Sequence, residues 1–215
     1  MTTLQQSRVR VRTSALAVWS LVGGGIAFFA GGAMHPKEDP PGITGKEHLH
    51  VMFQDPLWYP AHAVLLLGML LMTVGLVRLV RDANYAGTPV GTALRLAAVA
   101  SALGTGDMVL HLLAKLQDGA VAAGDTALLV DAHLVIESIT VPLFGLAITW
   151  LAVTGARGRA FGNWFIAAFA VVGGVTYAVA AGTIGFTEAL DALFPFAGLI
   201  GVWAVATGLW LRRSA

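Results

Sequence analysis

Two pairs of ionisable residues stand four positions apart within long apolar stretches of this chain. Asp107 and His111 form the first pair, and His133 and Glu137 form the second. Residues four apart lie about one turn apart on the same face of a helix, so each pair can act as a chelating unit. Because an ionised carboxylate in a membrane is costly unless it is paired, protonated or bound to a metal, both acids need a partner.

A fifth residue, His62, is expected at the same depth in the membrane as these pairs, counted along each helix from its arginine-bearing end. At about 1.5 Å per residue, His62 lies roughly 24 Å along its helix from Arg78, and His111 lies roughly 24 Å from Arg95. Glu137 lies roughly 24 Å from the expected helix end at Val153 on the same scale. The predicted metal site therefore consists of His62, Asp107, His111, His133 and Glu137.

The residue types at this site narrow its chemistry. The chain has no cysteine, so any metal must be held by His, Asp, Glu, Met or backbone oxygen. Imidazoles with carboxylates and no thiolate favour zinc, iron or Cu(II). We expect His62, His111 and His133 to bind the cofactor, with Asp107 or Glu137 as a further ligand or as the catalytic proton acceptor. This predicts a metal-dependent membrane protein, with hydrolase and oxidoreductase chemistry both left open.

Three other interpretations stay open at this stage. Two of the three intramembrane histidines could ligate haem b in a cytochrome that exchanges electrons with quinone. Asp107 and Glu137 could instead serve a proton- or cation-coupled transporter. The chain could also be a scaffold subunit in which the same pairs join helices by hydrogen bonds. A lipophilic substrate and a homo-oligomer are compatible with the sequence, whereas no nucleic-acid-binding stripe is present.

A connection rich in proline and glycine, residues 34–58, adds three more histidines. It contains His35, His48 and His50, together with Met34 and Met52. Imidazoles and thioethers could capture copper, or these histidines could simply be solvated. The sequence does not decide whether they belong to the site. The proline and glycine content predicts a loop without a helix.

The elements that must position these residues are transmembrane helices. The 215 residues are 57% hydrophobic and only 12% charged, far from the composition of soluble domains. A span needs roughly 20 mostly apolar residues. Six segments qualify, at 14–33, 59–79, 90–113, 126–153, 161–182 and 188–211. We expect one all-α domain over residues 1–215, a six-helix bundle built of antiparallel hairpins, with Glu188 and Asp191 beginning the last helix.

Arginine placement orients the predicted bundle. All ten arginines fall on one side of the six spans: Arg8, Arg10, Arg12, Arg78, Arg81, Arg95, Arg157, Arg159, Arg212 and Arg213. Positive residues near helix ends stay cytoplasmic, so both termini are expected in the cytoplasm and the histidines at the outer face of a bacterial-type plasma membrane. Lys37, Lys46 and Lys115 lie on the opposite side.

One internal similarity joins the fourth and sixth predicted helices. Residues 141–155 and 194–208 align without gaps, with Pro142 opposite Pro195 and Trp150 opposite Trp203. Chance similarity of Ala/Gly/Val-rich helices and a true repeat are both open. A repeat would place the two prolines as kinks at corresponding depths.

Overall fold

The computed structural model describes residues 13–36, 43, 45–82, 85–184, 187 and 189–214, and every regular element among them is helical. The elements are α1 (Ala15–Met34), α2 (Gly45–Gln54), α3 (Trp58–Asp82), α4 (Pro89–Ala114), η1 (Lys115–Gln117), α5 (Asp118–Ala123), α6 (Leu128–Arg157), α7 (Trp164–Thr183), η2 (Asp191–Ala197) and α8 (Gly198–Ser214). Arg8, Arg10 and Arg12 lie outside the described residues, as do Lys37 and Glu188.

Six helical segments among the described residues are long and apolar enough to cross a membrane, which confirms the predicted all-α membrane fold. They are α1, α3, α4 continued through α5, α6, α7, and η2 continued through α8. Large apolar side chains such as Phe165 and Val135 are exposed on their outer surfaces. Bilayer hydrocarbon is the solvent that suits such a surface, because no comparable apolar area is tolerated in water.

The helices pack through small residues that let backbones approach closely. In α1, Gly25 lies against the Gly201 carbonyl of α8, while Gly68 of α3 lies against the Phe28 backbone of α1. Gly145 of α6 meets Gly174 of α7 in the same way. Small-residue contacts of this kind are the usual basis of helix association in membranes. Around the bundle, α3 lies between α1 and α4, and α6 lies between α4 and α7. The last helix, α8, packs against α1 and α7.

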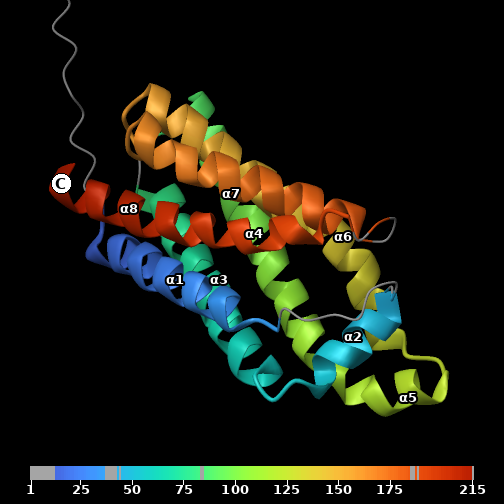
Figure 1. Ribbon diagram of the computed structural model, residues 1–215. Helices are drawn as coiled ribbons and strands as arrows, with labels where there is room; N and C mark the ends of the chain where they lie inside the picture. The colour runs from blue at the N-terminus through green and yellow to red at the C-terminus, as the bar shows by residue number, and fades with distance from the viewer. Residues whose placement is uncertain are drawn as a thin grey trace, which may run out of the picture.

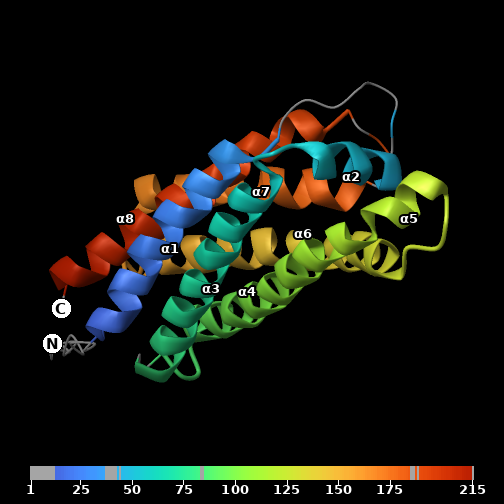
Figure 2. The ribbon, with the colours of Figure 1, turned by 90° about the horizontal axis from the view of Figure 1, so that it is seen from below.

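The bundle has two chemically different ends. The histidine end carries His62, His111 and His133, together with the short helices α2 and α5, which lie far from the C-terminus in Figures 1 and 2. The arginine end contains the last turns of α3 and α8, with Arg81 and Arg212. Between the ends, the described core is apolar and includes Leu76, Leu94 and Ile148.

The prediction that residues 34–58 contain no helix is wrong, because residues 45–54 form α2. All four prolines of the connection fall outside this helix, whereas one of its two glycines, Gly45, is the first residue of α2. Pro40, Pro41 and Gly42 lie outside the described residues. Within α2 the apolar residues Leu49, Met52 and Phe53 share one buried face. Burial of that face stabilises a helix too short to be stable alone.

Helix ends also differ from the predicted spans. The sixth span begins with the 3₁₀ segment η2, which contains Pro195, and the α-helix starts only at Gly198. Pro142, in contrast, lies inside the continuous helix α6. Trp150 is 41% exposed whereas Trp203 is 1% exposed. The two aligned segments therefore have different local structures and surroundings, although a distant repeat stays a prediction.

Candidate functional site

The five predicted site residues meet at the histidine end. His62 comes from α3, Asp107 and His111 from α4, and His133 and Glu137 from α6. We call these five residues the His–carboxylate cluster. The ring centroids of His62 and His111 are 4.5 Å apart, and those of His111 and His133 are 4.2 Å apart. All three imidazoles are buried.

His133 lies at the centre of the cluster and has a partner on each ring nitrogen. Its Nδ1 lies 3.0 Å from Oδ1 of Asp107. Its Nε2 lies 3.1 Å from Oε2 of Glu137 and 2.5 Å from Nδ1 of His111. An ionised carboxylate only accepts hydrogen bonds, so Nδ1 of His133 carries a proton toward Asp107. Nε2 is then the atom on which His111 and Glu137 converge.

Asp107 is itself held on both oxygens. Its Oδ2 accepts a hydrogen bond from Oγ1 of Thr140 at 3.1 Å, while Oδ1 faces His133. The Asp107 side chain is 5% exposed. The hydroxyl of Thr140, a residue that sequence analysis did not place at the site, therefore fixes Asp107. The only sequence signal for this contact is that Thr140 stands seven residues after His133, on the same face of α6.

His62 is fixed by the backbone of its own helix. Its Nδ1 donates to the carbonyl oxygen of Trp58 at 2.6 Å, because a carbonyl can only accept. This fixes the tautomer and leaves a lone pair on Nε2. The ring also stacks on the Trp58 indole, at 4.5 Å between centroids and an interplanar angle of 29°. Trp58, which sequence analysis did not place at the site, is fully buried and forms one wall of the cluster.

The fourth imidazole, His35, extends the row. It follows the last residue of α1, and its ring centroid lies 4.7 Å from that of His62. Sequence analysis left its membership open, and the structure places it at the edge of the cluster. His50 lies elsewhere, since its Nδ1 contacts Oδ1 of Asp118 in α5 at 2.6 Å. His48 belongs to α2 with His50.

The helix α2 lies over the outer end of these residues. Phe53 packs edge-on against Trp58, with 5.1 Å between ring centroids, and its carbonyl oxygen accepts a hydrogen bond from Nζ of Lys115. Lys46 of α2 pairs with Asp131 of α6 at 2.6 Å. The predicted lysine-bearing side therefore has a structural role, because these contacts join α2 to α3, η1 and α6.

The two carboxylates of the cluster share one close ion-pair partner. In the part of the chain that the structure describes, Asp107 and Glu137 form ion pairs only with His133. One imidazolium can balance one carboxylate, and His35 and His48 are the other imidazoles close enough for their charge to act on Glu137. The indole Nε1 of the buried Trp58 also has no hydrogen-bond partner among the described residues. A buried donor without an acceptor is rare, although Nε1 of Trp203, in the apolar core, is unpaired in the same way.

The side chains nevertheless do not form a ready coordination shell. No group of three or more His, Asp or Glu among the described residues is placed so that it could hold a metal ion directly. Two ligand atoms bound to one ion at about 2.1 Å lie about 3.0 Å apart in octahedral geometry and about 3.4 Å apart in tetrahedral geometry. The contact between His133 Nε2 and Glu137 meets that spacing, whereas the nitrogens of His111 and His133 are closer, at 2.5 Å. An ion would therefore require these two rings to separate slightly.

Comparison with known proteins gives no relative for this arrangement. The chain matches no protein-family model, no curated protein and no solved structure.

Proposed function

We propose that this chain is an integral membrane protein that binds one transition-metal ion, zinc, iron or copper, in the His–carboxylate cluster. His62, His111, His133 and Glu137 hold the ion, and Asp107 orients His133. The observation that carries this proposal is that both ring nitrogens of His133 have partners. Asp107 fixes its Nδ1, while its Nε2 contacts His111 and Glu137. A histidine whose other nitrogen is fixed by a carboxylate is the usual outer-shell pattern of metal ligands.

The second imidazole supports the same function. His62 donates from Nδ1 to the Trp58 carbonyl, which is the other common outer-shell partner of a metal-binding histidine. Its free Nε2 is then available as a ligand atom. A cation in the cluster also balances the carboxylate that His133 alone leaves unbalanced. These two features revise the role predicted for Asp107, which becomes an orienting residue in place of a ligand.

The cluster suits catalysis in the membrane by a hydrolase or an oxidoreductase. When bound, the ion supplies Lewis acidity or redox chemistry. If one oxygen of Glu137 binds the ion, its second oxygen is the carboxylate atom available to accept a proton, because the Glu137 side chain is 19% exposed whereas that of Asp107 is 5% exposed. A proton acceptor must reach the reacting group directly or through one water.

Haem b and ion transport are less well supported by the same packing. The imidazole rings contact one another at 4.2 and 4.5 Å, whereas two axial histidines of a haem have a macrocycle between them. A transport path would have to continue toward the arginine end. There the described core consists of apolar residues such as Met72, Leu79 and Leu151.

The proposed topology follows from the positive-inside rule. The arginine end, with Arg81, Arg157 and Arg212, faces the cytoplasm, and the histidine end faces the outer side of a bacterial-type plasma membrane. Both termini are then cytoplasmic and the six spans form antiparallel hairpins. Two contacts support this arrangement for α1 and α3: Leu21 lies against Gly75, and Gly31 lies against Leu65. The residue numbers increase along α1 while those of their partners decrease along α3, so the two helices are antiparallel.

Elemental analysis and an absorbance spectrum of the detergent-purified protein test the proposal. We expect about one zinc, iron or copper per chain, which is lost in His133→Ala and retained in His50→Ala. The control is matched because His50 contacts Asp118 and lies apart from His133. A Soret band would instead establish haem. The proposal is overturned if the protein contains no stoichiometric metal and none of the three metals raises its melting temperature.

A further inference from the structure

The imidazoles of the His–carboxylate cluster are buried, so a metal ion needs a route to reach them. His62, His111 and His133 are 1%, 6% and 2% exposed. An ion that leaves water for apolar surroundings loses far more free energy than an uncharged group does, unless ligands or opposite charges replace its water. The route must therefore be lined by atoms that can bind a cation.

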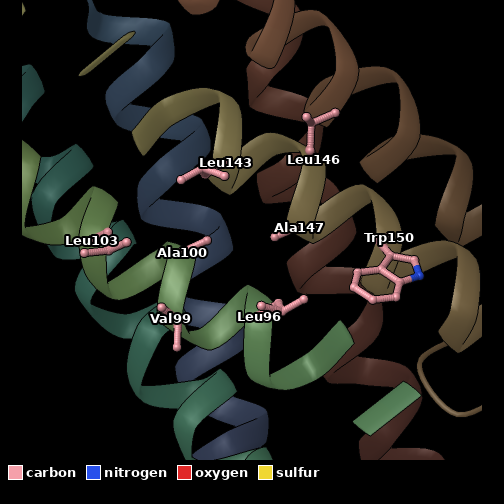
Figure 3. A pocket seen from close by; sticks show the side chains of 8 residues that line it. All are labelled: Leu96, Val99, Ala100, Leu103, Leu143, Leu146, Ala147 and Trp150. Carbon is pink, nitrogen blue, oxygen red and sulfur yellow. The ribbon is translucent and has the colours of Figure 1, made fainter. Parts of the chain in front are cut away.

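The membrane-facing side of α4 and α6 does not supply such atoms. The pocket between these helices is lined by apolar side chains, among them Leu103, Leu143 and Trp150 (Figure 3). These residues lie within two of the six membrane-spanning segments. Toward the arginine end, the described core is equally apolar, with residues such as Leu79 and Leu151. The route for an ion therefore starts at the histidine end.

At the histidine end, His35 reaches from the surface to the first buried ligand. It directly follows the last residue of α1, which is one of the six spans, and so lies at the level where the membrane ends. Its side chain is half-buried, whereas that of His62 is fully buried. The two rings contact each other edge to face. His35 is thus the more accessible member of a pair of adjacent imidazoles.

The spacing of these two rings allows both to bind one ion. An imidazole bound at about 2.1 Å has its ring centroid about 3.2 Å from the ion, so two rings that share an ion lie at most about 6.5 Å apart. The centroids of His35 and His62 are 4.7 Å apart. Their separation is therefore within the range that a shared ion permits.

Both imidazoles also present the same nitrogen to a metal. Nδ1 of His35 donates to the carbonyl oxygen of Pro36 at 2.8 Å, as Nδ1 of His62 donates to that of Trp58. A neutral imidazole with its proton on Nδ1 binds a metal through Nε2. His35 is also the C-cap of α1, and the negative end of a helix favours a nearby cation.

The deeper ligands lie beyond His62 in the same row. The ring centroids of His62 and His111 are 4.5 Å apart, and His35 is close enough for its charge to act on His111 and Glu137. An ion held by His35 and His62 can therefore exchange ligands in steps. Its bond to His35 breaks as bonds to His111 and Glu137 form, its remaining waters leave, and its oxidation state does not change.

We propose that His35 is the entry ligand of the His–carboxylate cluster, which binds an incoming metal ion together with His62 and passes it to the buried ligands. This describes how the proposed metal site is loaded, and so it rests on the proposed function. Because His35 releases the ion at the end of the transfer, it changes the rates of binding and release and leaves the final affinity unchanged.

Rapid mixing of the metal-free, detergent-purified protein with Zn²⁺ tests this inference, because a nitrogen and oxygen site for iron or Cu(II) also binds zinc. A fluorescent zinc indicator measures uptake, and transfer of bound zinc to excess EDTA measures release. In His35→Ala we expect both rates to fall by roughly tenfold, while the dissociation constant stays within about twofold of that of the unaltered protein. Equal falls are expected because uptake and release pass through the same step.

Two further variants make the test specific to the imidazole. His35→Gln retains the size and polarity of the side chain but is a poor ligand, and it should show the same fall in both rates. His50→Ala removes another imidazole of the histidine end, one that contacts Asp118 in α5, and should leave both rates unchanged. Melting temperatures of all variants are measured without metal, and we expect them to match that of the unaltered protein.

Three results would overturn the inference. Faster uptake in His35→Ala would show that the ring only obstructs the route, and unchanged rates would show that the ion enters elsewhere. Faster release with a weaker affinity would make His35 a permanent ligand. In all three cases the unaltered protein still binds zinc, so the proposed metal site would stand. An unaltered protein that binds no metal would instead overturn both proposals.

Discussion

The hydroxyl of Thr140 in α6 donates to Oδ2 of Asp107 in α4 across 3.1 Å, and the other oxygen of that carboxylate faces His133 at 3.0 Å. Asp107 is thus fixed between two residues of a neighbouring helix. An outer-shell carboxylate held this firmly sets the tautomer of its histidine, which makes the Thr140–Asp107 contact part of the cluster and not only a link between helices.

Asp107→Asn should therefore weaken metal binding without unfolding the protein. The amide keeps the size and the contact to Thr140, but it no longer favours a proton on Nδ1 of His133. Loss of an outer-shell partner typically costs about 10–100-fold in metal affinity. Competition with a chromogenic chelator measures the change. Asp125→Asn, at an exposed position between α5 and α6, is the control, and equal affinities of the two variants would contradict the orienting role.

Glu137→Gln should separate metal binding from stability. Without metal, the variant removes a mostly buried negative charge, so its melting temperature should equal or exceed that of the unaltered metal-free protein. The rise in melting temperature on adding metal should disappear, since a neutral amide is a poor ligand. Thermal melts without metal check the first expectation, and melts with added metal check the second. A full metal-induced rise in the variant would exclude Glu137 as a ligand.

The packing of α2 should depend on Phe53 far more than on its surface ion pair. Phe53 is 1% exposed and contacts Trp58. Truncation of a buried phenylalanine costs about 3–5 kcal/mol, so Phe53→Ala should release α2. Lys46→Gln breaks a half-exposed pair with Asp131, which is worth about 0–1 kcal/mol. Hydrogen exchange over residues 45–54 should rise strongly in the first variant and little in the second.

Two glycines of α1 should respond oppositely to alanine. A Cβ at Gly25 would lie 2.4 Å from the Gly201 carbonyl oxygen of α8, whereas nothing lies within 4 Å of a Cβ at Gly32. Gly25→Ala should force α1 and α8 apart and lower the melting temperature. Gly32→Ala should be neutral or stabilising, because alanine favours the helix by roughly 0.5–1 kcal/mol. Equal melting temperatures of the two variants would contradict the close α1–α8 contact.

The sequence allowed the spans and the depth of the site residues to be predicted, because hydropathy and rise per residue depend only on position along a helix. Rotation about each helix axis could not be predicted in the same way. It is set by backbone contacts such as Gly145 with Gly174, and it decides that Thr140 meets Asp107. The helix α2 was missed for a related reason, since its stability comes from burial against Trp58 and not from its own length.

The contact between Gly25 and Gly201 also has a consequence for biosynthesis. The three helices that carry the His–carboxylate cluster, α3, α4 and α6, leave the ribosome before α8 does. The first helix, α1, can therefore pack on α3 early, but its second face stays open to lipid until the last span has been translated. Chains that stall before residue 198 would contain every cluster residue and still lack the helix that covers α1.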